Sequence, residues 1–146
     1  NWWSDADREE FSSRTAKLIE QYGEFTPEGL DPKYKVNGGF TIGENIGDLG
    51  GLSIALVAYQ LATEGTTPPV IDGLTGVQRV FYSWAEIWRT KTREAEAIRR
   101  LSIDPHSPPE FRCNGVVRNI DVFYDAFDVK PGDTLYLDEA DRVRIW

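Results

Sequence analysis

The sequence predicts a mainly α-helical fold with little sheet. Three long segments carry apolar residues at helical spacing, and each follows a residue that can cap a helix. The stretches between them are rich in glycine and proline, which is typical of loops. The 146 residues, 40% of them hydrophobic, suffice for one domain with its own core and are too few for two.

The first helix is expected in SDADREEFSSRTAKLIEQY, residues 4–22, where Ser4 and Asp7 stand in a capping-box-like relation. Its apolar stripe is thin and consists of Phe11, Leu18 and Tyr22. So narrow a stripe indicates a helix lying on the surface of something larger. The following GEFTPEGLDPKYKVNGG is expected to be a loop, with a turn at Asn37-Gly38.

The second helix is expected from about Thr41, taken as its N-cap, to about Thr63. Its helically spaced apolar residues are Ile42, Ile46, Leu49, Leu56 and Tyr59. The side that carries Glu44 and Asp48 continues through small residues, namely Gly51, Ala55 and Ala58. Because small residues let another backbone approach closely, this helix is expected to be covered on more than one side.

The third helix is expected to begin after Thr75 and to continue along RTKTREAEAIRRL to residue 101. Its wide apolar face consists of Val77, Val80, Phe81, Trp84, Ile87 and Trp88. Alternating acids and bases in its second half indicate a solvated surface. Beyond it we expect a proline-stiffened loop (SIDPHSPPEFRCNG), a short amphipathic helix (IDVFYDAFDV) and an extended tail that ends on Trp146.

Composition narrows the classes of function. A net charge of −8 disfavours non-specific binding to nucleic acid or to an anionic membrane surface. The longest apolar runs, such as LSIALVAY, fall short of the roughly 20 residues that span a bilayer, and no signal peptide is evident. We therefore expect no membrane contact from this segment, while its localisation stays open. The single cysteine, Cys113, excludes an internal disulfide and is expected to be a small buried or semi-buried thiol.

Glu44 and Asp48 are the acids that need an explanation. They lie one helical turn apart in an apolar segment, where two buried carboxylates would repel each other and lose hydration. A divalent metal ion with hydrogen-bonding groups around it would compensate. Alternatively, both acids lie at a solvated helix start, which the helix dipole favours. A Ca²⁺ site is a poorer fit, because it needs about six to eight oxygen ligands and no loop supplies them.

The string around this pair, NGGFTIGENIGDLGGL, resembles the second zinc-site motif of the neprilysin-type zinc endopeptidases, G-E-N-I-x-D-x-G-G. The resemblance implies that Glu44 is a zinc ligand. It also implies that Asp48 orients one of the zinc-binding histidines.

Other segments resemble the same family in the same order and extend the match to nearly the whole chain. DPHSPPEFRCNGVVRNIDVFYDAF places His106 on the residue that stabilises the oxyanion and Arg112 on the residue that contacts substrate carbonyl groups. FYSWAEIW places Ile87 and Trp88 in the S1′ pocket, and RVRIW resembles the family's C-terminal ending. Without this context, the same residues could be a surface histidine, an arginine in an ion pair and two core side chains.

The family's H-E-x-x-H motif, which supplies two histidine ligands and the general base, does not occur in the sequence. We therefore expect residues 1–146 to be the C-terminal segment of a thermolysin-like, neprilysin-type catalytic domain, with the motif in an upstream part of the same protein. The resemblance is to bacterial members, since cysteines that pair in animal homologues are absent. The full-length protein would cleave peptide substrates with one zinc ion, and this chain alone would be inactive. The alternative is a non-catalytic acidic helical binding module or an inactive fragment.

Overall fold

The computed structural model describes residues 2–145, so that Trp146 of the expected tail lies outside the described residues. The described chain forms α1 (Asp5–Gly23), α2 (Gly38–Ala62), α3 (Gly76–Ile87), α4 (Glu94–Ile103), α5 (Pro109–Val117), α6 (Asp121–Phe127) and the short 3₁₀ helix η1 (Glu139–Asp141). Within residues 2–145 the β-type pairing is limited to an isolated bridge between Ile71 and Leu74. The predicted mainly α fold with little sheet is confirmed. No helix in this range is both long and apolar enough to cross a membrane.

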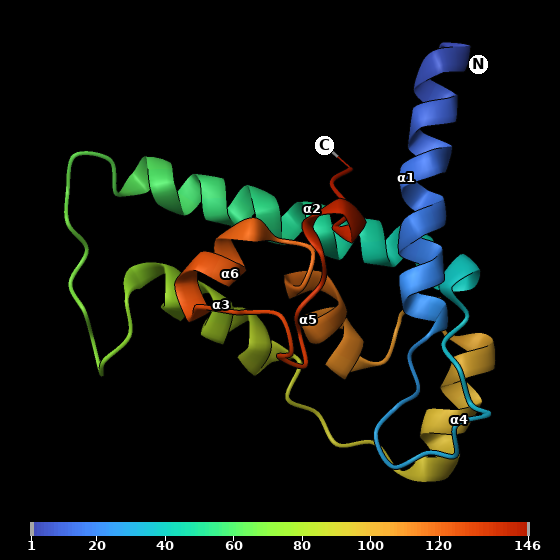
Figure 1. The fold of residues 1–146 in the computed structure, drawn as a ribbon. Coiled ribbons are helices and arrows are strands. Elements are labelled where there is room, and N and C mark those ends of the chain that lie inside the picture. Colours follow the sequence, from blue (N-terminus) through green and yellow to red (C-terminus); the bar gives the residue numbers. More distant parts are fainter. Residues whose placement is uncertain (1, 146) are drawn as a thin grey trace.

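The long helix α2 is the element around which the others are arranged (Figure 1). Helix α1 crosses its N-terminal part, while α3, α5 and α6 lie together along one side of it. The buried core between these helices includes Leu18, Tyr22, Leu49, Leu52, Leu56, Phe81, Phe111, Val116 and Phe123. Residues far apart in the sequence thus meet along α2, and α5 packs directly against it.

Side-chain caps set the helix starts, as expected for two of the three long helices. The Ser4 hydroxyl accepts a hydrogen bond from the amide of Asp7 at 3.1 Å. Thr75 and Gln78 form a complete capping box at the start of α3. The predicted start of α2 is wrong, because the N-cap is Asn37 and not Thr41. The Asn37 side chain caps the amide of Phe40, so the expected turn is the first turn of the helix.

Two other expectations about the helices are wrong. The helix expected over residues 76–101 is divided, since α3 ends at Ile87 and α4 begins at Glu94. The acids in the first turn of α4, Glu94 and Glu96, favour a new N-terminus there. The loop expected over residues 102–115 contains α5, because proline is favourable at the first position of a helix and Pro109 starts one.

The small-residue side of α2 is not covered within the described residues. Gly51, Ala55 and Ala58 are all exposed, contrary to the expectation that this side is packed. Ile54 and Leu61, on the same C-terminal half of the helix, are 68% and 67% exposed. The predicted packing of this side is therefore absent from residues 2–145, and an apolar strip of α2 faces outward.

The crossing of α1 and α2 depends on Gly38, the buried first residue of α2. A Cβ atom added at Gly38 would overlap the backbone carbonyl oxygen of Ile19 in α1 and lie 3.0 Å from its carbon. A backbone group cannot rotate away, so the two helices would have to separate. Gly39, the next residue, is exposed, and a Cβ there would meet only the Asn37 side chain at 3.6 Å.

We expect Gly38→Ala to destabilise the full-length protein by about 3 kcal/mol, the upper range for an added group in a packed core. Gly39→Ala, in the same helical turn, is expected to leave stability unchanged or raise it by about 0.5 kcal/mol through helix propensity. Thermal unfolding of the two variants measures the difference. Equal unfolding temperatures would contradict the close approach of α1 to Gly38.

Candidate active site

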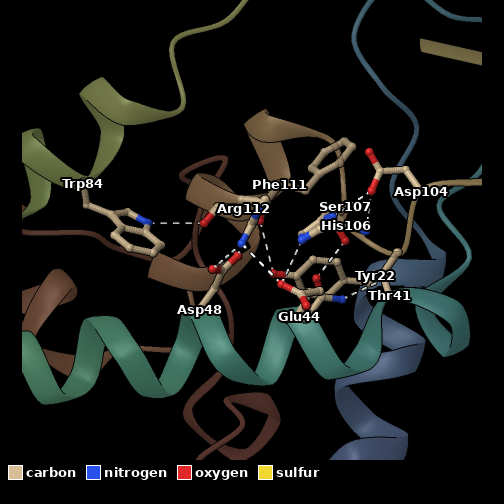
Figure 2. A network of polar contacts seen from close by, with 11 residues as sticks. Tyr22, Thr41, Glu44, Asp48, Trp84, Asp104, His106, Ser107, Phe111 and Arg112 are labelled. Carbon is tan, nitrogen blue, oxygen red and sulfur yellow. Dashed lines mark hydrogen bonds and ion pairs between the residues drawn. The ribbon is translucent and has the colours of Figure 1, made fainter. Parts of the chain in front are cut away.

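The four residues expected to form the chemical centre lie together where α2 meets α5 (Figure 2). Glu44 and Asp48 project from successive turns of α2. His106 lies in the short loop that precedes α5, and Arg112 lies in the first half of α5. Asp48 and Arg112 are 64 residues apart in the sequence, so packing of α5 on α2 creates the cluster.

His106 is held between two carboxylates. Its Nε2 lies 3.0 Å from Oε2 of Glu44, and its Nδ1 lies 2.7 Å from Oδ1 of Asp104. The backbone amide of His106 also donates to Asp104, and this hydrogen bond is the main reason why the pKa of the Asp104 carboxyl group is lowered. The ring can donate to both carboxylates only as the imidazolium. Asp104 therefore fixes the ring orientation and directs Nε2 towards Glu44.

Arg112 forms a two-pronged ion pair with Asp48. Its Nε and Nη2 donate to the two carboxylate oxygens at 2.6 and 2.7 Å, and the Asp48 side chain is only 9% exposed. The hydrogen bonds that Arg112 donates to Asp48 are the main cause of the raised pKa of Arg112. The guanidinium also lies over the ring of Trp88, 4.2 Å from its centroid, and Nη2 is 3.8 Å from Oε2 of Glu44. Arg112 is thereby placed between the two acids of α2.

The backbone of α5 is fixed at this point by two aromatic side chains. The buried hydroxyl of Tyr22 in α1 donates to the carbonyl of Phe111 at 3.1 Å, and burial raises the pKa of this phenol. The indole nitrogen of Trp84 in α3 donates to the carbonyl of Arg112 at 3.2 Å. Helices α1 and α3 thus each contribute one hydrogen bond to the backbone of α5 at Phe111 and Arg112, and Tyr22 and Trp84 lie on opposite sides of Arg112 (Figure 2).

A second, fully buried set of hydrogen bonds lies behind His106. Ser107 donates from Oγ to Oδ1 of Asn45 at 2.7 Å, and Nδ2 of Asn45 donates to Oγ1 of Thr41 at 3.0 Å. The three residues are between 1% and 4% exposed. These bonds join the His106 loop to the first turns of α2.

A cavity of about 520 Å³ opens beside His106 and Arg112. Trp88 forms part of its wall, together with Val36, Leu101 and the loop of residues 90–92. Ile87, the other residue expected in a substrate pocket, is 60% exposed and is not part of the cavity lining. Of the expected pair, the structure therefore brings only Trp88 to the site.

The only histidine in the sequence contacts Glu44, not Asp48, whose two oxygens both accept from Arg112. Among the described residues, no three His, Cys, Asp or Glu side chains form a group that could hold a metal ion.

Cys113 is partly buried, and loss of hydration raises the pKa of its thiol. A raised pKa makes this thiol a poor nucleophile.

Three residues that lie inside the quoted motifs contribute to the site, although sequence reasoning gave them no role: Asp104, Asn45 and Ser107. The spacing of Asp104 and His106, two residues apart in DPHSPP, was the one local signal, because an aspartate there can bond back to the amide two residues on. Asn45 and Ser107 stand beside singled-out residues, but no pattern in the sequence links them to each other.

The whole segment matches known proteins. Peptidase family M13 matches residues 1–143. Neprilysin-11 of Caenorhabditis elegans is 40% identical over 131 residues, which are 87% of this chain and 15% of that protein. Neutral endopeptidase of Lactobacillus helveticus is 35% identical over 147 residues, which are 100% of this chain and 20% of that protein. The chain thus spans a fifth or less of these two relatives.

Solved structures give the same result. The zinc metalloprotease Zmp1 of Mycobacterium tuberculosis, in complex with an inhibitor, superimposes with a TM-score of 0.96 at 67% identity over all of this chain and 23% of that one. PepO of Lactobacillus rhamnosis superimposes with a TM-score of 0.83 at 34% identity, over 100% of this chain and 21% of that one. The helices described here are therefore arranged as in a part of these longer chains.

Proposed function

This chain belongs to peptidase family M13, and we propose that it is the C-terminal segment of the catalytic domain of a zinc-dependent endopeptidase that hydrolyses oligopeptides. The observation that carries the proposal is the meeting of Glu44, His106 and Arg112 at one contact between α2 and α5, beside a cavity. An exposed carboxylate next to a histidine and an arginine suits metal-assisted cleavage of a polarised bond.

Glu44 fits the role of zinc ligand. Its side chain is 45% exposed, and it contacts His106 and Arg112 through Oε2, so that Oε1 is the oxygen that would face a metal ion. A catalytic zinc ion takes about three protein ligands and keeps one position open. The other two ligands would be histidines of an upstream H-E-x-x-H motif. Asp48 would accept a hydrogen bond from one of them while keeping its bonds to Arg112, because each carboxylate oxygen has two lone pairs.

The residues of this chain would act on the substrate as follows. Bound zinc would polarise the scissile carbonyl and activate a water molecule. His106, oriented by Asp104, would turn its Nε2 hydrogen from Glu44 to the oxygen on which negative charge develops, and one such donor is typically worth about 3–4 kcal/mol. Arg112 uses Nε and Nη2 to bind Asp48. Its third nitrogen, Nη1, is not used in this pair and would donate to a substrate carbonyl group. Trp88 would form a wall for a substrate side chain.

The upstream part of the protein would pack on α2. The exposed strip of α2 combines large apolar side chains (Ile54 and Leu61) with small ones (Gly51, Ala55 and Ala58). This surface suits close packing of another helix. Such an arrangement would place the upstream histidines next to Glu44.

The test is zinc content and peptide hydrolysis of the full-length protein. After exhaustive dialysis we expect about one zinc ion per chain. We also expect cleavage of oligopeptides that stops on chelation and returns with added zinc. The isolated 146-residue segment should cleave nothing, because it lacks the histidine ligands. A full-length protein that retains no zinc and cleaves no peptide would instead be a binding module.

A further inference from the structure

The buried bond between Ser107 and Asn45 lies directly behind the contact between His106 and Glu44. Asn45 follows Glu44 in the sequence, and Ser107 follows His106. The hydrogen bond of 2.7 Å between their side chains therefore ties together the two backbone segments that carry Glu44 and His106. We propose that Asn45 and Ser107 are positioning residues that set the place of His106 relative to Glu44. The effect of this positioning on catalysis rests on the proposed function.

Burial distinguishes this bond from the neighbouring contact between Glu44 and His106. The side chains of Glu44 and His106 are 45% and 44% exposed, and a polar contact between such exposed side chains contributes little to stability. Asn45 and Ser107 are 1% and 3% exposed, so breaking their bond would leave a buried polar group without a partner. The buried bond therefore holds the two segments together, and the exposed contact between His106 and Glu44 follows from it.

The direction of each hydrogen bond in the set is determined. The hydroxyl of Thr41 donates its one hydrogen to the carbonyl of Asn37, so towards Asn45 it can only accept. Asn45 must then turn its NH₂ group to Thr41 and its oxygen to Ser107, which donates. The set ends at Asn37, the N-cap of α2. One arrangement of the amide satisfies all partners, which makes the position of the loop well defined.

Asp104 cannot replace this anchor. Its bonds go to the amide and Nδ1 of His106, two residues away in the same loop. They orient the imidazole within the loop and do not join the loop to α2. Ser107 and Asn45 supply that connection.

The test uses Ser107→Ala in the full-length protein, measured on a fluorogenic peptide. We expect kcat to fall about tenfold or more with KM changed less than about twofold, since a displacement of about 1 Å can reduce the rate about 100-fold. Ser107→Thr keeps the hydroxyl group and should retain most of kcat. In a His106→Ala background, Ser107→Ala should change kcat by less than about twofold, because its effect acts through His106.

Asn119→Ala is the matched control. Asn119 is 2% exposed and accepts at Oδ1 from the amide of Val143 and from Gln21, while its Nδ2 donates to the carbonyl of Gly115 and back to Gln21. It has no bond to the His106 loop. This variant should lower the unfolding temperature and leave kcat unchanged. If Asn119→Ala reduces kcat as much as Ser107→Ala, or if Ser107→Ala loses the same factor with and without His106, the positioning role is refuted.

A second measurement does not depend on activity. Hydrogen exchange of the full-length protein, followed by mass spectrometry over residues 104–109, should be faster in Ser107→Ala than in the wild type and unchanged in Asn119→Ala. Unchanged exchange in Ser107→Ala would refute the anchor. If the wild-type protein cleaves no peptide, the proposed function fails, and exchange alone then decides whether Ser107 positions the loop.

Discussion

Glu44→Gln in the full-length protein is expected to release the zinc ion and abolish peptide hydrolysis. The substitution keeps the size of the side chain and removes the charge that a zinc ligand supplies. Loss of a group outside the ligand set already reduces metal affinity about 10–100-fold, so loss of a direct ligand should exceed that range. Zinc per chain after dialysis and the rate of peptide cleavage measure the two effects.

The control for this variant is Glu86→Gln. Glu86 lies on α3 in an exposed ion pair with Arg89, so the substitution removes the same charge away from the site. We expect it to leave zinc content and hydrolysis unchanged. Retention of one zinc ion per chain by Glu44→Gln would remove Glu44 from the ligand set, and Glu44 would then be only a half-exposed partner of His106 and Arg112.

Local chemistry explains which parts of the fold could be predicted. Ser4 and Thr75 cap their helices through hydrogen bonds to residues three positions further along the chain, and such short-range signals are visible in the sequence. The start of α2 was misplaced because Asn37 and Thr41 are both good caps, and only packing of Gly38 against α1 selects the first. The break between α3 and α4 was missed because alternating charges suit one long helix as well as two.

In the site, too, short-range signals could be read from the sequence and contacts made by packing could not. Glu44, His106 and Arg112 could be singled out because the motifs around them are specific. The bonds that hold them in place join residues 62 and 64 apart, Ser107 with Asn45 and Arg112 with Asp48. No local pattern encodes such contacts, since they exist only once α5 has packed on α2. The positions of the expected residues were thus predictable, and their partners were not.

The pairing of Asp48 with Arg112 should have a large effect on stability when one partner is removed. Asp48→Ala removes the two-pronged partner of a guanidinium that is 17% exposed and leaves it only the more distant Glu44. Loss of one partner of a buried pair destabilises by about 3 kcal/mol. Removal of both side chains in Asp48→Ala/Arg112→Ala should be less destabilising than the sum of the single changes, with a coupling energy of about 2 kcal/mol. Thermal or urea unfolding of the three variants measures it.

The pair of Glu96 with Arg99 on α4 is a suitable comparison, because it has the same two-pronged geometry on an exposed surface. Solvent screens that pair, so Glu96→Ala should change stability far less than Asp48→Ala does. Similar losses for the two variants, or strict additivity at Asp48 and Arg112, would show that the ion pair does not secure α5 to α2. Non-additivity at Asp48 and Arg112 together with a small loss in Glu96→Ala would instead mean that one contact both stabilises the helix packing and holds Arg112 beside Glu44.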